Sequence, residues 1–321
     1  MAVPQTKSLP LTGDKINLDQ VLTNKEFDKK LNMPRFNSKA PTRIISVSLS
    51  KGGVGKTTTA AHLAHGLSLQ NRKVLLVDTD RQNQCSLILG CSPVFGTSEF
   101  TNPRESDRFQ FKDVVHIDDS RPLLHFLAGS DSLDAWEDIA SDVARNDMLN
   151  PFRKFEFIRE AFKSIEKNYD YIIFDTPPKI GVIGYNVLFY ARELLIPVFL
   201  SAMTEDSVKK FLESYSKIVQ MQERLNEKPL KLKYFLPTFE DSTRASRSSY
   251  AALENTVKII KQQGAKTSYL KDVKLLSPIP QTTRIKELPS FGQTIFESSP
   301  ASAGAQAYGI LIEEIIKDEK K

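Results

Sequence analysis

Hydrophobic and polar positions divide the chain into two parts that meet near residue 43. Residues 1–42 are polar, contain four prolines, and show helical spacing only in a short patch made by Leu18, Val21 and Leu22. From residue 43 onward, short β-branched runs alternate with longer segments whose apolar residues recur at helical spacing. This alternation is typical of parallel strands joined by crossover helices. We therefore expect an N-terminal extension over residues 1–42 and one domain over residues 43–321.

The periodic part of the sequence predicts an α/β fold: a doubly wound, mostly parallel sheet with helices on both faces. The expected strands are residues 44–49, 74–77, 123–127, 171–174, 194–200 and 232–236. The expected helices are residues 57–69, 133–145, 155–167, 206–225, 245–263 and 303–317. Residues 92–122 show no clear period, so we expect them to form a surface insertion.

Composition narrows the class of protein. With 321 residues, 40% of them hydrophobic and 26% charged, the chain is long and apolar enough to bury a core without disulfide staples. Its two cysteines, Cys85 and Cys91, are too few for a disulfide framework and favour a reducing compartment. The N-terminus lacks a secretion signal, and the apolar runs are far shorter than the roughly 20 residues of a membrane span. We therefore expect a cytoplasmic protein that does not cross a membrane.

A glycine-rich loop directly follows the first expected strand. It matches the phosphate-binding pattern G-x-x-x-x-G-K-[ST] in a variant form, with a strand before it and a helix after it. Glycines let consecutive backbone N–H groups turn toward phosphate oxygens, and the helix N-terminus adds partial positive charge. The sequence therefore predicts a site for the phosphates of a nucleotide. The loop residues expected to bind the nucleotide are Lys51, Gly52, Gly53, Val54, Gly55, Lys56, Thr57 and Thr58.

The side chains of this loop suit a nucleotide that carries a magnesium ion. Lys56 would neutralise the β and γ phosphates, and the Thr57 hydroxyl is the expected Mg²⁺ ligand. Thr58 is placed to bond the α-phosphate. We therefore expect Mg²⁺ and a nucleotide with β and γ phosphates as the cofactors of this chain.

Three aspartates follow two other expected strands. Asp78 and Asp80 come at the end of the strand 74–77, and Asp175 ends the strand 171–174. The carboxyl ends of parallel strands are the edge at which open α/β sheets bind ligands. A carboxylate at the tip of a hydrophobic strand, behind a phosphate loop, orders the water shell of Mg²⁺. We assign Asp175 to the metal on this basis.

These motifs, in this order, resemble the ParA and MinD class of deviant Walker A ATPases. The signature Lys-Gly-Gly-x-Gly-Lys-Thr stands at residues 51–57, Asp-Thr-Asp at 78–80, and Asp-Thr-Pro-Pro at 175–178. A later segment, Ile-Pro followed by basic residues and Glu-Leu-Pro-Ser-Phe-Gly at residues 287–292, is similar to ParA proteins in particular. The resemblance covers the chain from about residue 43 to its end.

The resemblance implies ATP as the nucleotide, and it implies roles for the residues of the first two motifs. In this class the first lysine of the loop reaches the phosphates bound by the partner subunit, which implies this role for Lys51 and a homodimer made by ATP. The second aspartate of the switch motif helps to position the attacking water, so we expect Asp80 to act in catalysis with Lys51 and Lys56. The first, Asp78, is implied to lie close to the Mg²⁺ shell.

Two segments depart from the family pattern. After Asp80 the family continues Pro-Gln-Gly-Asn-Ala-Thr, whereas residues 81–86 read Arg-Gln-Asn-Gln-Cys-Ser, so the resemblance does not imply the conformation of this switch loop. In the later segment the family approaches the adenine, which implies a nucleotide contact for Pro280. The first arginine after Ile-Pro is replaced by Gln281, so Arg284 and Lys286 are implied to carry the DNA contact there.

The formal net charge of +5 is unevenly distributed. Residues 1–43 hold eight basic and four acidic side chains, and residues 228–286 hold twelve basic and four acidic ones, so the remainder is acidic. Binding to duplex DNA without base readout needs several lysines and arginines that face phosphates. We expect Arg244, Arg247, Arg284 and Lys286 to supply this contact.

We therefore expect a ParA-like ATPase that partitions a plasmid, a chromosome or a phage-plasmid. Its implied partners are a ParB-like centromere-binding protein that stimulates hydrolysis, non-specific double-stranded DNA and a second copy of the chain, at the nucleoid and not at a membrane. A MinD-like ATPase positioned on a membrane is the alternative, and an electron-transfer protein similar to nitrogenase iron protein is disfavoured by the cysteine positions. The extension 1–42 is either a loosely packed arm or an arm that binds DNA or a partner.

Overall fold

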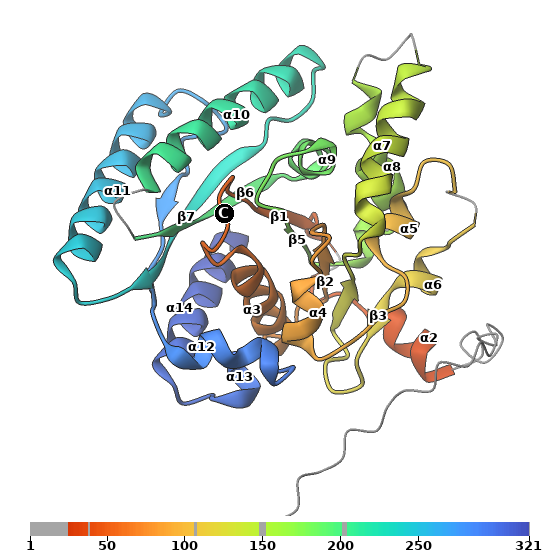
Figure 1. The fold of residues 1–321 in the computed structure, drawn as a ribbon, viewed down its shortest axis with the longest axis horizontal. Helices are drawn as coiled ribbons and strands as arrows, with labels where there is room; N and C mark the ends of the chain where they lie inside the picture. The colour runs from red at the N-terminus through yellow and green to blue at the C-terminus, as the bar shows by residue number, and fades with distance from the viewer. Residues whose placement is uncertain (1–24, 38, 106–107, 148–151, 201–203, 321) are drawn as a thin grey trace, which may run out of the picture.

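Strand β1 (Arg43–Val47) lies inside a mostly parallel sheet in the computed structural model of the chain (Figure 1). The structure describes residues 25–37, 39–105, 108–147, 152–200 and 204–320. The other strands are β2 (Val74–Asp78), β3 (His116–Ile117), β4 (Leu124–Leu127), β5 (Tyr171–Asp175), β6 (Glu193–Phe199), β7 (Lys231–Glu240), β8 (Lys274–Leu275) and β9 (Ile279–Pro280). Among the described residues these nine strands form one sheet in the order β3-β4-β2-β5-β1-β6-β7-β8, with β9 paired to β7.

The predicted fold class and all six predicted strands are confirmed. All the pairs are parallel except that of β3 with β4 at one edge. The sequence analysis missed β3, β8 and β9, because a strand of two residues is too short to show a hydrophobic period.

Helices cover both faces of the sheet. One group packs above the sheet in Figure 1: α7 (Ser132–Arg145), α8 (Phe157–Phe162), α9 (Val182–Tyr190), α10 (Thr204–Arg224) and α11 (Arg244–Gln263). The second group packs below it: α3 (Lys56–Leu69), α4 (Gln84–Leu89), α12 (Thr283–Glu287), α13 (Ile295–Ser298) and α14 (Ala303–Lys317). Neighbouring residues of one strand enter opposite cores, since Ile44 packs with the first group and Ile45 with the second. Burial on both faces explains why these strands are continuous apolar runs.

Two expectations about the middle of the chain are wrong in part. The helix expected at residues 155–167 is only α8 (Phe157–Phe162), with single 3₁₀ turns, η1 (Arg153–Phe155) and η2 (Glu166–Asn168), on either side. Residues 92–122 are not only a surface insertion. They form α5 (Thr97–Thr101), α6 (Phe111–Val114) and β3, and they bury Val114 and Val115 in the core. The apolar residues of this stretch contact the core at irregular spacing, which leaves no period to detect.

The described part of the N-terminal region lies against the sheet. Helix α2 (Lys25–Leu31) is followed by Arg35, whose Nε donates to Asp170 Oδ1 at 3.2 Å. Lys73 Nζ donates to the carbonyl oxygens of Leu31 and Met33, each at 2.7 Å. These bonds fasten residues 31–35 to the edge of the sheet at which β2 and β5 begin. The patch made by Leu18, Val21 and Leu22 lies outside the described residues.

The strand order places the candidate site. Later strands extend the sheet from β1 in both directions, β2 and β4 on one side and β6 and β7 on the other, and β5 lies between β1 and β2. In open α/β sheets ligands bind at the carboxyl ends of the strands where the order reverses. In the described part of the chain, no helix is both long and apolar enough to span a bilayer.

Candidate nucleotide-binding site

Three neighbouring strands bring the predicted motifs together. The glycine-rich loop follows β1, Asp78 ends β2, and Asp175 ends β5. Asp175 is the register partner of both Val47 on β1 and Asp78 on β2, so the loop and the two aspartates meet at one level of the sheet edge. Asp175 thereby joins one site with loop residues more than 100 positions earlier in the sequence.

The backbone of the loop depends on two of its glycines. Gly53 has φ 70° and Gly55 has φ 87°, a left-handed region that residues with a Cβ rarely adopt. Neither Gly52 nor Gly53 has another atom within 4 Å of the position a Cβ would take. The loop therefore presents open backbone, which is what close approach to a phosphate requires. Gly55 is also the residue that precedes α3, so the helix N-terminus points into the same region.

The other loop residues lie around this backbone. Val54 is buried, and Lys51, Thr57 and Thr58 are half-buried. The Lys56 side chain is buried too, and its Nζ donates to the carbonyl oxygen of Lys51 at 2.8 Å. Burial lowers the pKa of Lys56, and the negative charges of the nearby aspartates oppose that shift. The ammonium group is therefore held over the loop by one backbone oxygen.

The end of β7 supports the loop from outside. Thr238 Oγ1 donates to the carbonyl oxygen of Val54 at 2.9 Å, and the Phe239 ring lies 3.6 Å from the position of a Cβ on Gly55. Phe239 has φ 55°, which is strained for an aromatic residue. No local pattern in the sequence pointed to these two residues, because their role depends on β7 lying beside β6 in the folded sheet.

Burial dominates the electrostatics of the two aspartates. Asp78 and Asp175 have no exposed surface, and burial raises the pKa of Asp175 to about 7. Burial, followed by the charge of Asp175, also raises the pKa of Asp78 well above its usual range. Lys56 contributes an opposing positive charge. Two adjacent buried carboxyl groups favour a bound cation, which would neutralise both.

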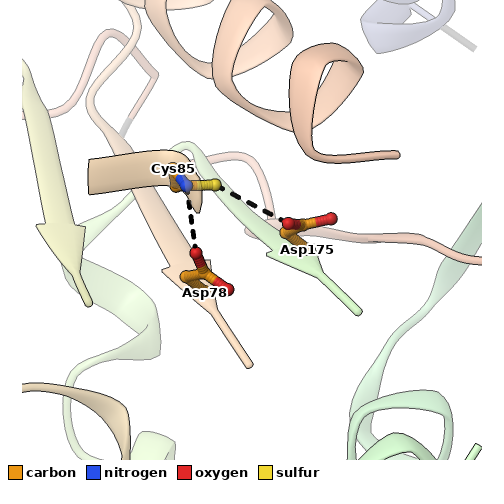
Figure 2. Close-up of side chains that lie close together, drawn as sticks. All are labelled: Asp78, Cys85 and Asp175. Atoms are coloured by element: carbon orange, nitrogen blue, oxygen red, sulfur yellow. Dashed lines mark hydrogen bonds between the residues drawn. The ribbon is translucent and has the colours of Figure 1, made fainter. Parts of the chain in front are cut away.

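A third side chain completes this cluster, and the sequence analysis gave it no role. Cys85, in the first turn of α4, donates its backbone N–H to Asp78 Oδ2 at 3.2 Å (Figure 2). Its thiol faces Asp175 Oδ2 at 3.7 Å. Burial, ahead of the two neighbouring carboxylates, raises the pKa of Cys85 well above its usual range. Its position depends on α4 folding back over β2 and β5.

The switch loop keeps a tight turn despite its unusual sequence. Asp80 donates its N–H to Asp78 Oδ1 at 2.8 Å, and its own Oδ1 accepts the N–H of Gln82 at 3.0 Å. Asn83 has φ 46° and stands where the family pattern has glycine; asparagine tolerates this left-handed conformation better than most residues. Arg81 Nη1 bonds Asp134 Oδ2 of α7 at 2.6 Å. Asparagine thus substitutes for glycine in forming the turn.

The later segment is placed beside the same loop. Pro280 is half-buried in β9, where it is the register partner of Glu240 on β7, next to Phe239. Gly292 has φ 62° and packs against Gly90 at the end of α4, where a Cβ on either glycine would overlap the backbone of the other. Gly292 of the segment therefore contacts the end of the helix that follows the switch loop.

The four basic residues expected to contact DNA lie outside the buried cluster, on two helices. Arg244 and Arg247 are exposed at the start of α11, and Arg284 and Lys286 are exposed on α12. The two helices follow β7 and β9, which are paired, so all four residues come from the same edge of the sheet. The Arg284 side chain is 66% exposed, and its Nη1 lies 3.8 Å from Glu287 Oε2.

The residues present fit a nucleotide triphosphate with Mg²⁺. Asp175 Oδ1 is buried and, among the described residues, has no partner at normal hydrogen-bond distance. The open glycine backbone, the buried lysine and this orphaned carboxylate oxygen supply the three kinds of group that such a ligand needs. A buried carboxylate without a partner is costly, so an incoming cation would stabilise it.

Comparisons with known proteins agree with this geometry. A family model described as an AAA domain matches residues 42–229. The chromosome partitioning protein ParA of Myxococcus xanthus is 30% identical over 275 residues, which are 86% of this chain and 88% of that protein. Two solved structures share the fold. The ATP complex of a Cyanothece McdA variant has a TM-score of 0.68 at 20% identity over 87% of this chain and 97% of that chain. The structure of cobyrinic acid a,c-diamide synthase of Mycobacterium smegmatis, with bound ADP and magnesium, has a TM-score of 0.65 at 24% identity. The match covers 87% of this chain and 96% of that chain.

A glycine-rich loop after β1 that faces two strand-end aspartates defines a P-loop nucleotide-binding fold. The chain belongs to the AAA domain family, and within it to the ParA/MinD class of P-loop ATPases. The resemblance inferred from the motifs is therefore confirmed.

Proposed function

We propose that the chain is a Mg²⁺-dependent ATPase that partitions DNA, in the manner of the ParA proteins it resembles. The observation that carries this proposal is the meeting of the glycine-rich loop, Asp78 and Asp175 at one edge of the sheet. The name of the Myxococcus relative supports chromosome partitioning, and the ligands of the two solved structures support ATP and Mg²⁺.

Each residue of the site has a proposed part in ATP binding. The open backbone of Gly52, Gly53 and Gly55 cradles the phosphates, and Lys56 turns from the Lys51 carbonyl to the β and γ phosphates. The Thr57 hydroxyl and the carboxyl groups of Asp78 and Asp175 hold Mg²⁺ and its water shell. Bound Mg²⁺ supplies positive charge where the γ-phosphate leaves. The remaining contacts are a bond from Thr58 to the α-phosphate, loop packing by Val54, and an adenine contact by Pro280.

Hydrolysis needs residues from the switch loop and from a second copy of the chain. Asp80, half-buried next to Asp78, positions the attacking water. Lys51 stands at the mouth of the loop and is half-buried, and we propose that it reaches the phosphates bound by the partner. These contacts make the dimer dependent on ATP. Turnover is slow in the absence of a stimulating protein, and the time it takes sets how long the dimer persists.

DNA retention and release complete the proposed cycle. Arg244, Arg247, Arg284 and Lys286 face the phosphates of double-stranded DNA without base readout, and this holds the dimer at the nucleoid in the cytoplasm. A ParB-like centromere-binding protein stimulates hydrolysis and releases it. We retain residues 1–42 as an extension of the ATPase domain 43–321. The MinD-like alternative gains no support from α14, which buries Leu311, Ile312 and Ile315 against the core.

ATP turnover tests this proposal. It is measured for the wild type and for Asp80→Ala, alone, with non-specific DNA, and with the product of the neighbouring gene as the candidate partner. We expect slow turnover that rises when DNA and the partner are added together, and loss of that rise in Asp80→Ala with nucleotide binding retained. Asp138→Ala, an exposed aspartate on α7, is the matched control and keeps wild-type turnover. Equal turnover of Asp80→Ala and the wild type would refute the role of Asp80.

A further inference from the structure

The sulfur atom beside the two buried aspartates is unexpected in a magnesium site. Asp78, Cys85 and Asp175 each offer one ligand atom, these atoms lie within 4.8 Å of one another, and all three residues are buried (Figure 2). They form the only group of this kind in the part of the chain that the structure describes. Mg²⁺ prefers oxygen ligands, whereas thiolates select softer cations such as Zn²⁺. The family pattern quoted above has alanine at this position, so the sulfur is a property of this chain.

The distances suit a tetrahedral cation. A zinc ion bound to one thiolate and one carboxylate holds the sulfur and oxygen atoms about 3.6 Å apart, from its usual bond lengths and the tetrahedral angle. Cys85 Sγ and Asp175 Oδ2 are 3.7 Å apart. The two ligand atoms are therefore already spaced for a shared ion, without movement of β5 or α4.

An unsatisfied oxygen of Asp175 shows that the cluster lacks positive charge. Asp175 has no exposed surface, and its Oδ1 has no partner at normal hydrogen-bond distance among the described residues. A buried carboxylate oxygen in this state is costly unless it meets a cation or a donor. Asp175 therefore turns Oδ2 toward Cys85 and leaves Oδ1, on the far side of the carboxyl group, unpartnered in the described part of the chain, so its negative charge is not compensated by hydrogen bonds (Figure 2).

We propose that Asp78, Cys85 and Asp175 form a binding site for a thiophilic divalent cation, of the class of Zn²⁺ and Cd²⁺. The cation replaces the thiol proton: the S–H bond of Cys85 breaks, a metal–sulfur bond forms, and the proton passes to solvent. No electron is transferred. Two carboxylates and one thiolate then surround the ion, and a water molecule completes a tetrahedron. This site shares Asp78 and Asp175 with the proposed Mg²⁺ site and differs from it by the Cys85 sulfur, so the two cations compete for the same carboxylates. It does not depend on the proposed partition function.

Cadmium binding tests the proposal with a signal that only a metal–sulfur bond gives. Cd²⁺ is added to the full chain without nucleotide or DNA, and the near-ultraviolet charge-transfer absorption of cadmium thiolate is recorded. We expect one equivalent of Cd²⁺ to produce the band and Zn²⁺ to abolish it by displacement. Mg²⁺ competes for the carboxylates but forms no favourable bond to sulfur, so we expect an equal concentration of Mg²⁺ to leave the band in place. Asp175→Asn should weaken it, because the variant removes a charged ligand.

Two cysteine variants locate the sulfur. Cys85→Ala should lose the band, and Cys85→Ser, which keeps the size of the side chain, should lose it as well. Cys91→Ala is the matched control, since Cys91 is the other cysteine of the chain, and it should keep the band. Thermal melts of each variant confirm that it is folded. A band that persists in both folded Cys85 variants, or one that Cys91→Ala abolishes, would overturn the proposal. Turnover with Mg²⁺ is measured separately, so failure of the cation site and failure of the ATPase proposal are distinguishable.

Discussion

Asp78 and Asp175 lie at the same level of neighbouring parallel strands, and neither carboxyl group reaches solvent. The backbone fixes their relation, because the N–H of Thr79 donates to the carbonyl oxygen of Asp175 at 3.0 Å and the Thr79 hydroxyl donates to the same oxygen at 2.6 Å. Holding two buried carboxyl groups together therefore lowers the free energy of unfolding, but it places both groups where they can bind a cation. Stability and ligand binding should oppose each other at this site.

Removing one of these charges should stabilise the ligand-free protein. Because burial raises the pKa of Asp175 from 3.8 to about 7, its ionised form destabilises the fold, and this cost grows as pH rises from about 4 to 7. We expect Asp175→Asn to raise the melting temperature at pH 7.5 by about 2 °C or more. The gain should shrink as pH falls toward 4, where the wild-type carboxyl group is protonated.

Thermal melts without nucleotide or metal, at pH 7.5 and pH 5, measure this difference. Asp138→Asn, exposed on α7, is the control and should change neither melt. A melting temperature of Asp175→Asn below that of the wild type at pH 7.5 would show that the carboxylate stabilises the fold instead. The same variant should lose Mg²⁺-dependent ATP binding.

A glycine after β4 should prove essential for the switch loop. A Cβ on Gly129 would overlap the carbonyl oxygen of Asp80 and would lie 3.2 Å from Asp78 Oδ1. Gly129→Ala must therefore displace the backbone of Asp80, and we expect ATP turnover to fall by about tenfold or more, equivalent to about 1.4 kcal/mol of transition-state stabilisation. Turnover at saturating ATP is the measurement. Gly309→Ala, in α14 with no atom within 4 Å of its Cβ position, should keep full turnover and gain up to about 1 kcal/mol of stability.

His62 should make the fold sensitive to acid. Its Nε2 accepts the N–H of Ile295 at 2.9 Å, so its Nδ1 carries the proton that is donated to the carbonyl oxygen of Thr58 at 2.7 Å. Protonation of Nε2 would break the first bond, and burial lowers the pKa of His62 from 6.5 to about 4. A lowered folded-state pKa gives stability that is present above pH 6.5 and is lost as pH falls toward 4.

Chemical denaturation between pH 7 and pH 4 measures this loss. We expect the wild type to lose up to about 3 kcal/mol through His62 over this range, and His62→Gln to show a shallower slope from a lower starting stability. The slope should not vanish, because burial also lowers the pKa of His65 to about 4. Identical slopes for the wild type and His62→Gln would be evidence against a neutral buried imidazole at this position.

Charge reversal tests the DNA contact separately from the nucleotide site. The triple substitution Arg244→Glu, Arg247→Glu and Arg284→Glu should abolish binding to non-specific duplex DNA, since each reversal removes a phosphate contact and adds repulsion. ATP binding should be unchanged, because these side chains lie outside the buried cluster. The control for net charge reverses three exposed residues, Lys112 on α6, Arg145 on α7 and Lys163 directly after α8. These helices lie on the opposite side of the molecule from α11 (Figure 1). DNA binding that survives the first triple but not the second would move the interface to α6–α8.

The sequence predicted the parts of the site that lie in one continuous segment. It did not predict contacts between segments that only the folded sheet brings together. A loop such as residues 51–58 is one continuous segment, so its glycines, Lys56 and Thr57 were recognisable before the structure. The fold class was also predictable, because strands and helices alternate along the chain, whereas the order of the strands in the sheet was not. Asp78 and Asp175 were assigned singly, but their direct opposition followed only from β5 lying between β1 and β2.

Residues that support the site from outside the predicted motifs had no sequence pattern that pointed to them. Thr238 and Phe239 act on the loop through the placement of β7, and Gly129 acts on the switch through the end of β4. The sequence analysis used Cys85 to exclude a disulfide framework and gave it no role in the site, and only the folded α4 shows its thiol beside Asp175. Such contacts join segments 30 or more positions apart, which periodicity and motif spacing do not report.

Nucleotide-dependent retention on DNA is the measurement that bears on the proposed function as a whole. Wild-type protein and Lys56→Ala are passed over immobilised non-specific duplex DNA with ATP and Mg²⁺, with ADP and Mg²⁺, or without nucleotide. We predict that the wild type is retained with ATP and Mg²⁺ but not with ADP and Mg²⁺ or without nucleotide. Lys56→Ala should not be retained under any of these conditions, because the buried ammonium group is needed to hold the phosphates that close the dimer. Retention of Lys56→Ala equal to that of the wild type, or wild-type retention that does not depend on ATP, would show that this chain does not couple ATP to DNA binding.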